Sequence, residues 1–351
     1  MANKIEMTSM ERVLTTLGFK EPDRVPFFLC LSMYGAKEFN ISIKEYFSKA
    51  ENVVEGQLKM REKYRHDCIY TFFYAPIEVE AWGGEVIYFD DGPPNSGTPI
   101  IKKNEDIDRI QVPEVRKSLV LKNVLKATEL LKKNVGDKVP IIGVVMSPFS
   151  LPVMQLGFEK YLNLLYFDKV YFQKLMQINE KFCIEWANAQ LDAGATAICY
   201  FDPFASPMMI PRELYLKTGF HTAKRTISSI KGPTATHLAS GRAIGILDDL
   251  FNTGTNIVGV SAEENIGDIK KGCYNKLTVL GNFNGIEMRH WNAKETETKV
   301  KETIALAGKG GGFILSDNHG EIPWQVPEDV LLRISEAVHK WGRYPLQWVD
   351  K

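Results

Sequence analysis

Short apolar runs alternate with longer amphipathic stretches along most of the chain. The runs are rich in β-branched or aromatic residues, and the stretches between them repeat apolar positions with helical spacing. Strands that alternate with helices predict a parallel sheet with the helices packed outside it. The strand candidates are 25–32, 68–74, 139–147, 195–202, 233–238, 256–261, 276–282 and 311–317. Eight such strands predict an α/β fold of the closed (β/α)₈ type, a TIM barrel.

The clearest helical stretches separate these strands. They cover 118–135, 166–193, 212–230, 293–308 and 327–341. Pro327 followed by Glu328 and Asp329 is typical of a first helical turn, where a missing N–H is harmless and negative charge is favourable. Residues 78–116 are rich in Gly, Pro and Asp and predict an inserted hairpin and loop. Because no linker is evident, we predict one domain over 1–351, with a helical extension before the first strand.

Composition narrows the classes of function. Lys and Arg together number 43, as do Asp and Glu, so no overall field indicates a nucleic-acid or membrane partner. The N-terminal segment has no signal-type apolar core, and no stretch approaches the roughly 18 apolar residues of a membrane helix. Five scattered cysteines without a C-x-x-C pair fit a reducing compartment. We therefore predict a cytoplasmic enzyme, and leave open whether it is a homodimer.

Polar residues gather at the predicted strand ends, where barrel enzymes place their chemistry. Two of the six histidines are among them. The set consists of Ser147, Asp202, His237, Ser261, Glu263, Glu264, Asn282, Asn284, Asp317 and His319. Phe149 and other aromatics near the strand ends are typical core residues, but they would also line an apolar pocket for a flat ligand.

From this set we select candidate residues by type. The candidates for catalysis are the carboxylates Asp202, Glu264 and Asp317, and those for binding a cofactor are Ser147, Phe149, Asn282 and Asn284. Each also has a structural interpretation. His237 could be a core histidine bonded to a backbone carbonyl, and Asp202 and Asp317 could be turn or cap residues. Glu263 and Glu264 could complement the dipole of a following helix.

The ordered strand ends resemble the uroporphyrinogen decarboxylase superfamily, and within it the corrinoid-dependent methyltransferases. The resemblance covers nearly the whole chain and rests on the segments "EPDRVPFFL", "VEAWGGEV", "SPFSLPVMQLG", "LDAGATAICYFDPFAS", "THLASG" and "GGFILSDNHGEIPWQVPEDVLL". It implies a TIM barrel and either decarboxylation or methyl transfer.

The decarboxylase branch differs from this chain at its first strand. Its members carry an arginine-rich segment of the "MRQAGRY" type there, which pairs with the carboxylates of the tetrapyrrole. Residues 30–39 of this chain, "CLSMYGAKEF", contain no arginine, although Asp202 matches the aspartate of the family. Bidentate arginines are the expected partners of a multiply carboxylated substrate. Decarboxylation of a small or tetrapyrrole acid is therefore the alternative hypothesis.

The methyltransferase branch implies a metal site. Its thiol-methylating members bind zinc through a His-x-Cys pair and a further cysteine near the last strand. This chain has His237 and Ala239 at the first place and His319 at the second. The resemblance thus implies zinc held by His237, His319 and Glu263, with Glu264 or Asp202 as alternative third ligands and Asp317 supporting His319. Imidazole and carboxylate ligands leave a harder, more Lewis-acidic zinc than thiolates do.

Such a metal would polarise an ether oxygen. The resemblance therefore implies demethylation of a small methylated compound such as an aryl methyl ether. A separate corrinoid protein would accept the methyl group, because the D-x-H-x-x-G corrinoid motif begins at Asp317 but has Ile322 at its glycine position. Two alternatives are that no metal is bound, with His319 and Asp317 hydrogen-bonding the substrate, and that the barrel only binds a ligand.

Overall fold

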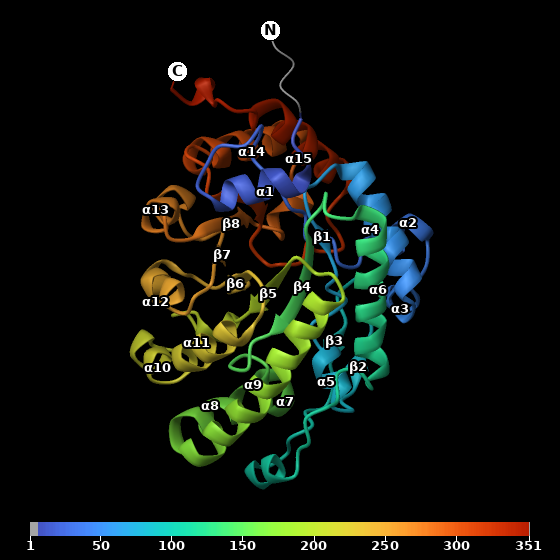
Figure 1. Cartoon of the computed structure of the whole chain (residues 1–351), viewed down its shortest axis with the longest axis vertical. Coiled ribbons are helices and arrows are strands. Elements are labelled where there is room, and N and C mark those ends of the chain that lie inside the picture. The colour runs from blue at the N-terminus through green and yellow to red at the C-terminus, as the bar shows by residue number, and fades with distance from the viewer. Residues whose placement is uncertain (1–5, 351) are drawn as a thin grey trace.

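Seven parallel strands form the centre of the molecule in a computed structural model that describes residues 6–350. They are β1 (Ile69–Tyr70), β4 (Ile141–Met146), β5 (Ala197–Phe201), β6 (Thr234–His237), β7 (Ile257–Gly259), β8 (Thr278–Phe283) and β9 (Phe313–Asp317). Neighbours in the sheet are neighbours in this order, and every pair is parallel. The strands curl into a barrel-like sheet with helices around them (Figure 1). The predicted α/β barrel architecture is confirmed.

The helices follow the predicted alternation. Those that precede β4 are α1 (Ser9–Leu17), α2 (Gly35–Phe39), α3 (Ile43–Ser48), α4 (Ala50–Tyr64), α5 (Ile77–Ala81) and α6 (Leu119–Val135). The later ones are α7 (Pro152–Leu156), α8 (Phe158–Phe167), α9 (Lys169–Asp192), α10 (Arg212–Lys217), α11 (Gly219–Ser229), α12 (Leu247–Asn252), α13 (Ile266–Gly272), α14 (Ala293–Ala307) and α15 (Glu328–Trp341). None of the described helices is long and apolar enough to cross a bilayer.

The first predicted strand, 25–32, is the main correction to the expected barrel. This segment forms one parallel bridge, between Phe27 and Leu315 of β9, and is not a regular strand. Pro26 has no N–H to give to a ladder, and the backbone turns where Leu31 N donates to Leu29 O at 2.8 Å. On its other side Phe27 O accepts from Asp67 N at 2.9 Å, close to β1. An irregular segment therefore spans the two edge strands of the sheet.

The predicted insertion is confirmed as a hairpin. Strands β2 (Val86–Ile87) and β3 (Asn95–Ser96) pair antiparallel, and a 3₁₀ helix (Asn104–Asp108) follows them. The predicted helical extension corresponds to α1, whose N-terminus carries a capping box between Thr8 and Glu11.

A buried ion cluster ties α1 to the barrel. Asp67 is fully buried and accepts from Arg12 at 2.7 Å and from Arg24 at 2.6 Å. Phe27 N donates to the same carboxylate at 2.9 Å. The cluster thus joins α1, the irregular segment and the start of β1 at the N-terminal end of the sheet.

Candidate active site

His237 is the last residue of β6 and lies in a slot that only glycines leave open. Its side chain is 1% exposed and stacks on Phe201, with ring centroids 5.2 Å apart and an angle of 13° between planes. A Cβ on Gly259 of β7 would be 2.3 Å from His237 Cδ2. A Cβ on Gly320 would be 2.7 Å from Phe201 Cε2 and 3.4 Å from His237 Cε1, and Gly320 has a φ of +78°. The slot therefore depends on glycine at both places.

A hydrogen bond to Nδ1 determines which nitrogen of the His237 ring carries the proton. Ala239 N donates to His237 Nδ1 at 3.0 Å, so Nδ1 is the acceptor and Nε2 carries the proton of the neutral ring. Nε2 is buried and has no hydrogen-bond partner among the described residues. Burial, together with neighbouring His319, lowers the pKa of His237 to about 4. A neutral imidazole thus presents an unsatisfied N–H donor.

The segment after β9 supplies further unsatisfied polar atoms. Asp317 Oδ2 accepts from His319 N and Gly320 N, both at 2.9 Å, which holds the turn. Asp317 therefore supports His319 through the backbone N–H of that residue. Asp317 Oδ1, Asn318 Oδ1 and His319 Nδ1 are buried without partners in the described structure. Burial raises the pKa of Asp317 and lowers that of His319, which favours the uncharged form of each.

Glu321 and Ser32 belong to the same site, although the sequence did not single them out. Ser32 Oγ donates to Glu321 Oε1, and burial of the carboxyl group raises the pKa of Glu321 to about 7. The available signals were weak: Glu321 stands two residues after His319, and Ser32 ends the first apolar run. Tyr70 lies on β1, the edge strand at the other side of the sheet from β9. Its hydroxyl donates to Gly320 O at 3.1 Å and so closes the site on that side.

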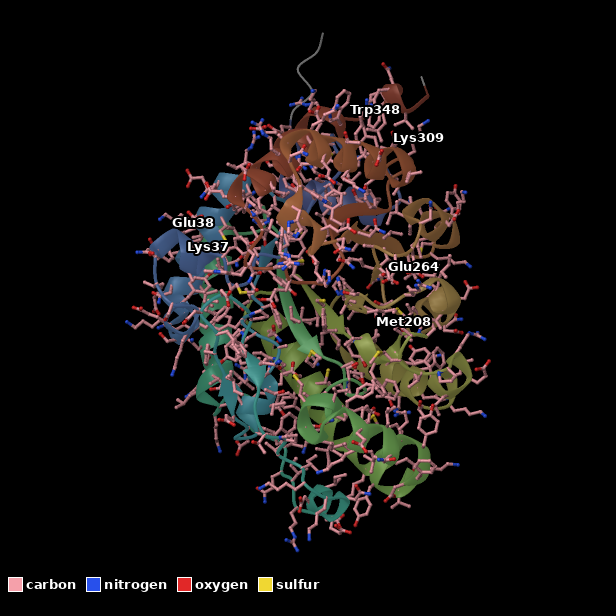
Figure 2. The ribbon with its side chains drawn as sticks, turned by 180° about the vertical axis from the view of Figure 1, so that it is seen from behind. Lys37, Glu38, Met208, Glu264, Lys309 and Trp348 are labelled. Atoms are coloured by element: carbon pink, nitrogen blue, oxygen red, sulfur yellow. The ribbon has the colours of Figure 1, made fainter. Side chains whose placement is uncertain are left out.

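Residues 321–326 are held in place by the segment around α2. Tyr34 donates to Pro323 O and also to Val326 O at 3.2 Å. The Lys37 ammonium lies 4.2 Å from the centre of the Tyr34 ring and 4.4 Å from the centre of the Trp324 ring. Lys37 is labelled in Figure 2. These contacts hold the segment that carries Glu321.

Asp202, directly after β5, is bonded to the loop that follows β4. It is fully buried, and its Oδ1 accepts from Ser147 Oγ and Ser150 Oγ, both at 2.6 Å. Burial raises its pKa to about 6 against the effect of the two hydroxyls, and Oδ2 has no described partner. Ser147 is therefore a partner of Asp202. Phe149 is fully buried and packs on Tyr161 and Phe204.

The remaining candidate residues form hydrogen bonds and an ion pair within the loops at the strand ends. Glu263 is exposed and pairs with Arg242 at 3.0 Å. Glu264 accepts from Ala243 N at 2.9 Å and from Ile244 N at 2.8 Å. The two asparagines have similar roles, Asn282 donating to the carbonyls of Ser261 and Glu264, and Asn284 accepting from Ile286 N and Glu287 N.

The predicted zinc ligands do not come together as a set. Among residues 6–350 there is no group of three His, Cys, Asp or Glu side chains that could hold a metal ion. Glu263 turns toward Arg242, and Glu264 toward backbone amides. For His237 to bind a metal through Nε2, its ring proton would have to move to Nδ1, which would break the hydrogen bond from Ala239 N. The predicted ligand set of His237, His319 and Glu263 is therefore not assembled in the described structure.

Comparison with known proteins identifies the family. The family model described as uroporphyrinogen decarboxylase (URO-D) matches residues 8–341. The chain belongs to the uroporphyrinogen decarboxylase family. The relationship predicted from the strand-end segments is thereby confirmed.

The chain is similar both to decarboxylases and to a methyltransferase. The uroporphyrinogen decarboxylase of Methylococcus capsulatus is 24% identical over 307 residues, which are 83% of this chain and 84% of the relative. The methylcobamide:CoM methyltransferase MtaA of Methanosarcina barkeri is 27% identical over 210 residues, which are 59% of this chain and 60% of the relative. A solved methyltransferase from Methanosarcina mazei shares the fold, with a TM-score of 0.84 and 20% identity over 95% of this chain and 99% of that one.

Proposed function

We propose that the protein moves a methyl group between a small methyl ether and the cobalt of a corrinoid bound to a separate protein. The observation that carries this proposal is the neutral His237 ring, whose buried Nε2–H donor has no partner. Such a donor can hydrogen-bond the oxygen of an ether. Similarity to MtaA and the geometry of this site together support methyl transfer, and aryl methyl ethers are one class of substrate to test.

The side chains of this chain supply a hydrogen bond and a proton. When the methyl carbon leaves the ether oxygen, the electron pair of the C–O bond remains on that oxygen. His237 Nε2–H orients the oxygen, and the protonated Glu321 carboxyl gives it a proton, so that an alcohol or phenol is released. A pKa of about 7 suits Glu321 to this exchange near neutral pH. The corrinoid, when its protein is bound, serves as the methyl acceptor.

The open end of the barrel suits a protein partner. Three apolar side chains in loops that follow strands are strongly exposed: Met208 is 55%, Ile244 54% and Ile286 49% exposed. They follow β5, β6 and β8, so they surround the C-terminal end of the sheet. In Figure 2 the labelled Met208 and Glu264 lie on the same side of the strands. An apolar rim of this kind supports docking of a separate corrinoid protein.

Decarboxylation is the second candidate, because the family model and the relative from Methylococcus capsulatus both carry that name. A carboxylated tetrapyrrole would need cationic partners. In the described structure no arginine bonds to Asp202, Asp317 or Glu321, and the nearby Arg242 pairs with Glu263. The site is therefore lined with carboxyl groups where this substrate needs guanidinium groups, which favours methyl transfer.

The test is a spectrophotometric assay with reduced corrinoid and a panel of methyl ethers. We expect the corrinoid spectrum to change from the cobalt(I) to the methylated form with at least one ether. The His237→Ala variant should be slower by about 10²–10⁴-fold, in the range of a lost acid or hydrogen-bond donor. The matched control is His221→Ala, because His221 lies exposed on α11. Carbon dioxide release from a carboxylated porphyrinogen, without methyl transfer from any ether, would establish the second candidate instead.

A further inference from the structure

The interior of the barrel contains a cavity of about 80 Å³ below His237. Its walls expose only apolar atoms. At the N-terminal end of the sheet it is bounded by Val13 and Leu17 of α1, and at the C-terminal end by His237 and Gly320. The cavity therefore reaches from the floor of the barrel to the residues of the proposed active site.

Small side chains at inward positions explain why the cavity exists. Barrel interiors are normally filled by layers of bulky branched residues. Here the lining includes Cys30, Cys68, Cys199 and Ala235, all buried. Buried space without atoms is destabilising, because the lining side chains lose packing partners. An apolar void of this kind stays dry and accepts apolar ligands.

We propose that this cavity binds a short hydrocarbon group of the substrate, of about two to four carbon atoms. The inference rests on the proposed function, because it places the ether oxygen of that substrate at His237. A cavity of roughly 150 Å³ is known to hold a benzene ring, so a void of about half that volume favours an alkyl group over an aryl ring. The alkyl group fills the barrel, the oxygen lies at His237, and the methyl group faces the open end.

Binding to the cavity can be tested separately from catalysis, with xenon as the probe and methyl propyl ether as the competing ligand. Xenon bound to the protein is followed by its NMR chemical shift while the ether is added. We expect the ether to displace xenon from the unmodified protein. In the Ala235→Leu variant, which adds three carbon atoms to the cavity wall, we expect the ether to bind about tenfold or more weakly, given the free energy of burying a few methylene groups.

An enlarging variant and a control keep the test decisive if the first variant folds poorly. Leu280→Ala removes a lining side chain, and we expect it to shift the preference toward methyl ethers with longer alkyl groups. Leu306→Ala is the control, because Leu306 is exposed on α14 and does not line the cavity. Ether binding that leaves xenon in place, or that is equally tight in both lining variants, would overturn the proposal. Ether that displaces xenon without any methyl transfer would reject the proposed function and keep the binding site.

Discussion

A single backbone N–H determines the chemistry of His237. Because Ala239 N occupies Nδ1, the proton of the neutral ring is fixed on Nε2, which faces no described partner. Ala239 has a φ of +51°, an uncommon value for a residue other than glycine. The backbone conformation that directs the Ala239 N–H toward the His237 ring is therefore a constrained one. The role of this histidine as a donor follows from its tautomer, which no spacing in the sequence could reveal.

Replacement of Gly320 should damage the slot through both the added Cβ and the backbone conformation. We expect Gly320→Ala to lower the free energy of unfolding by about 1–3 kcal/mol, because the new Cβ meets Phe201 and the backbone has a positive φ. The measurement is chemical denaturation. Gly310→Ala serves as the control, since its φ of +77° is similar but a Cβ there would meet nothing. Equal losses in both variants would show that backbone strain, and not the slot, accounts for the effect.

Glu321 should produce a descending limb in the pH profile of methyl transfer. The pKa of its carboxyl is raised to about 7, so the protonated form is present below that pH and is lost as the pH rises through it. We expect kcat to fall above about pH 7, and Glu321→Gln to be slower by about 10²–10⁴-fold because the amide cannot give up a proton. A rate that is unchanged in Glu321→Gln would rule out this residue as the proton donor.

Among the elements, α1 depends on a charge cluster as much as on apolar packing. The Asp67 carboxylate, at the start of β1, contacts two guanidinium groups and one backbone N–H. Since all of these groups are buried, they cannot exchange their partners for water. Removing the carboxylate would leave the buried Arg24 guanidinium without its acidic partner, whereas Arg12 would keep its pair with Asp23 at 2.6 Å.

Asp67→Asn should therefore be strongly destabilising. We expect a loss of about 3–5 kcal/mol in the free energy of unfolding, the usual consequence of breaking a buried ion pair. Urea denaturation measures it. Asp192→Asn provides the comparison, because Asp192 and its partner Arg116 are both exposed, and such pairs contribute about 0–1 kcal/mol. A loss below about 1 kcal/mol at Asp67 would contradict the importance of the cluster.

The sequence predicted most elements because hydrophobic periodicity reports burial directly. Seven of the strand runs and the insertion hairpin appear in the structure. The run 25–32 is as apolar as the others, but its Pro26 removes a ladder donor, and apolar content alone does not report backbone pairing. For the candidate site, proximity to strand ends selected His237, Asp317 and His319, which the structure places near one another. It could not show that Glu263 turns to Arg242, because side-chain direction depends on partners distant in the sequence.

The two ends of the barrel differ in structure and in the role that we propose for each. The N-terminal end is closed by α1 and the charge cluster, while the C-terminal end carries the polar site and the apolar rim of Met208, Ile244 and Ile286. The cavity of about 80 Å³ lies between them. A substrate held in the barrel would expose its methyl group toward the rim, where a corrinoid protein would dock.

This arrangement predicts that damage to the rim affects transfer to a protein-bound corrinoid alone. We expect Ile244→Glu to lower kcat/KM with the corrinoid protein by about tenfold or more, since a charge replaces an apolar contact in a desolvated interface. The same variant should transfer methyl groups to free cobalamin at the normal rate. Tyr274→Glu is the control: Tyr274 is 69% exposed and precedes β8, so it lies at the opposite end of the barrel. Equal rate losses with free and protein-bound corrinoid would place Ile244 in the substrate site, and an unchanged rate with both would move the docking surface away from this rim.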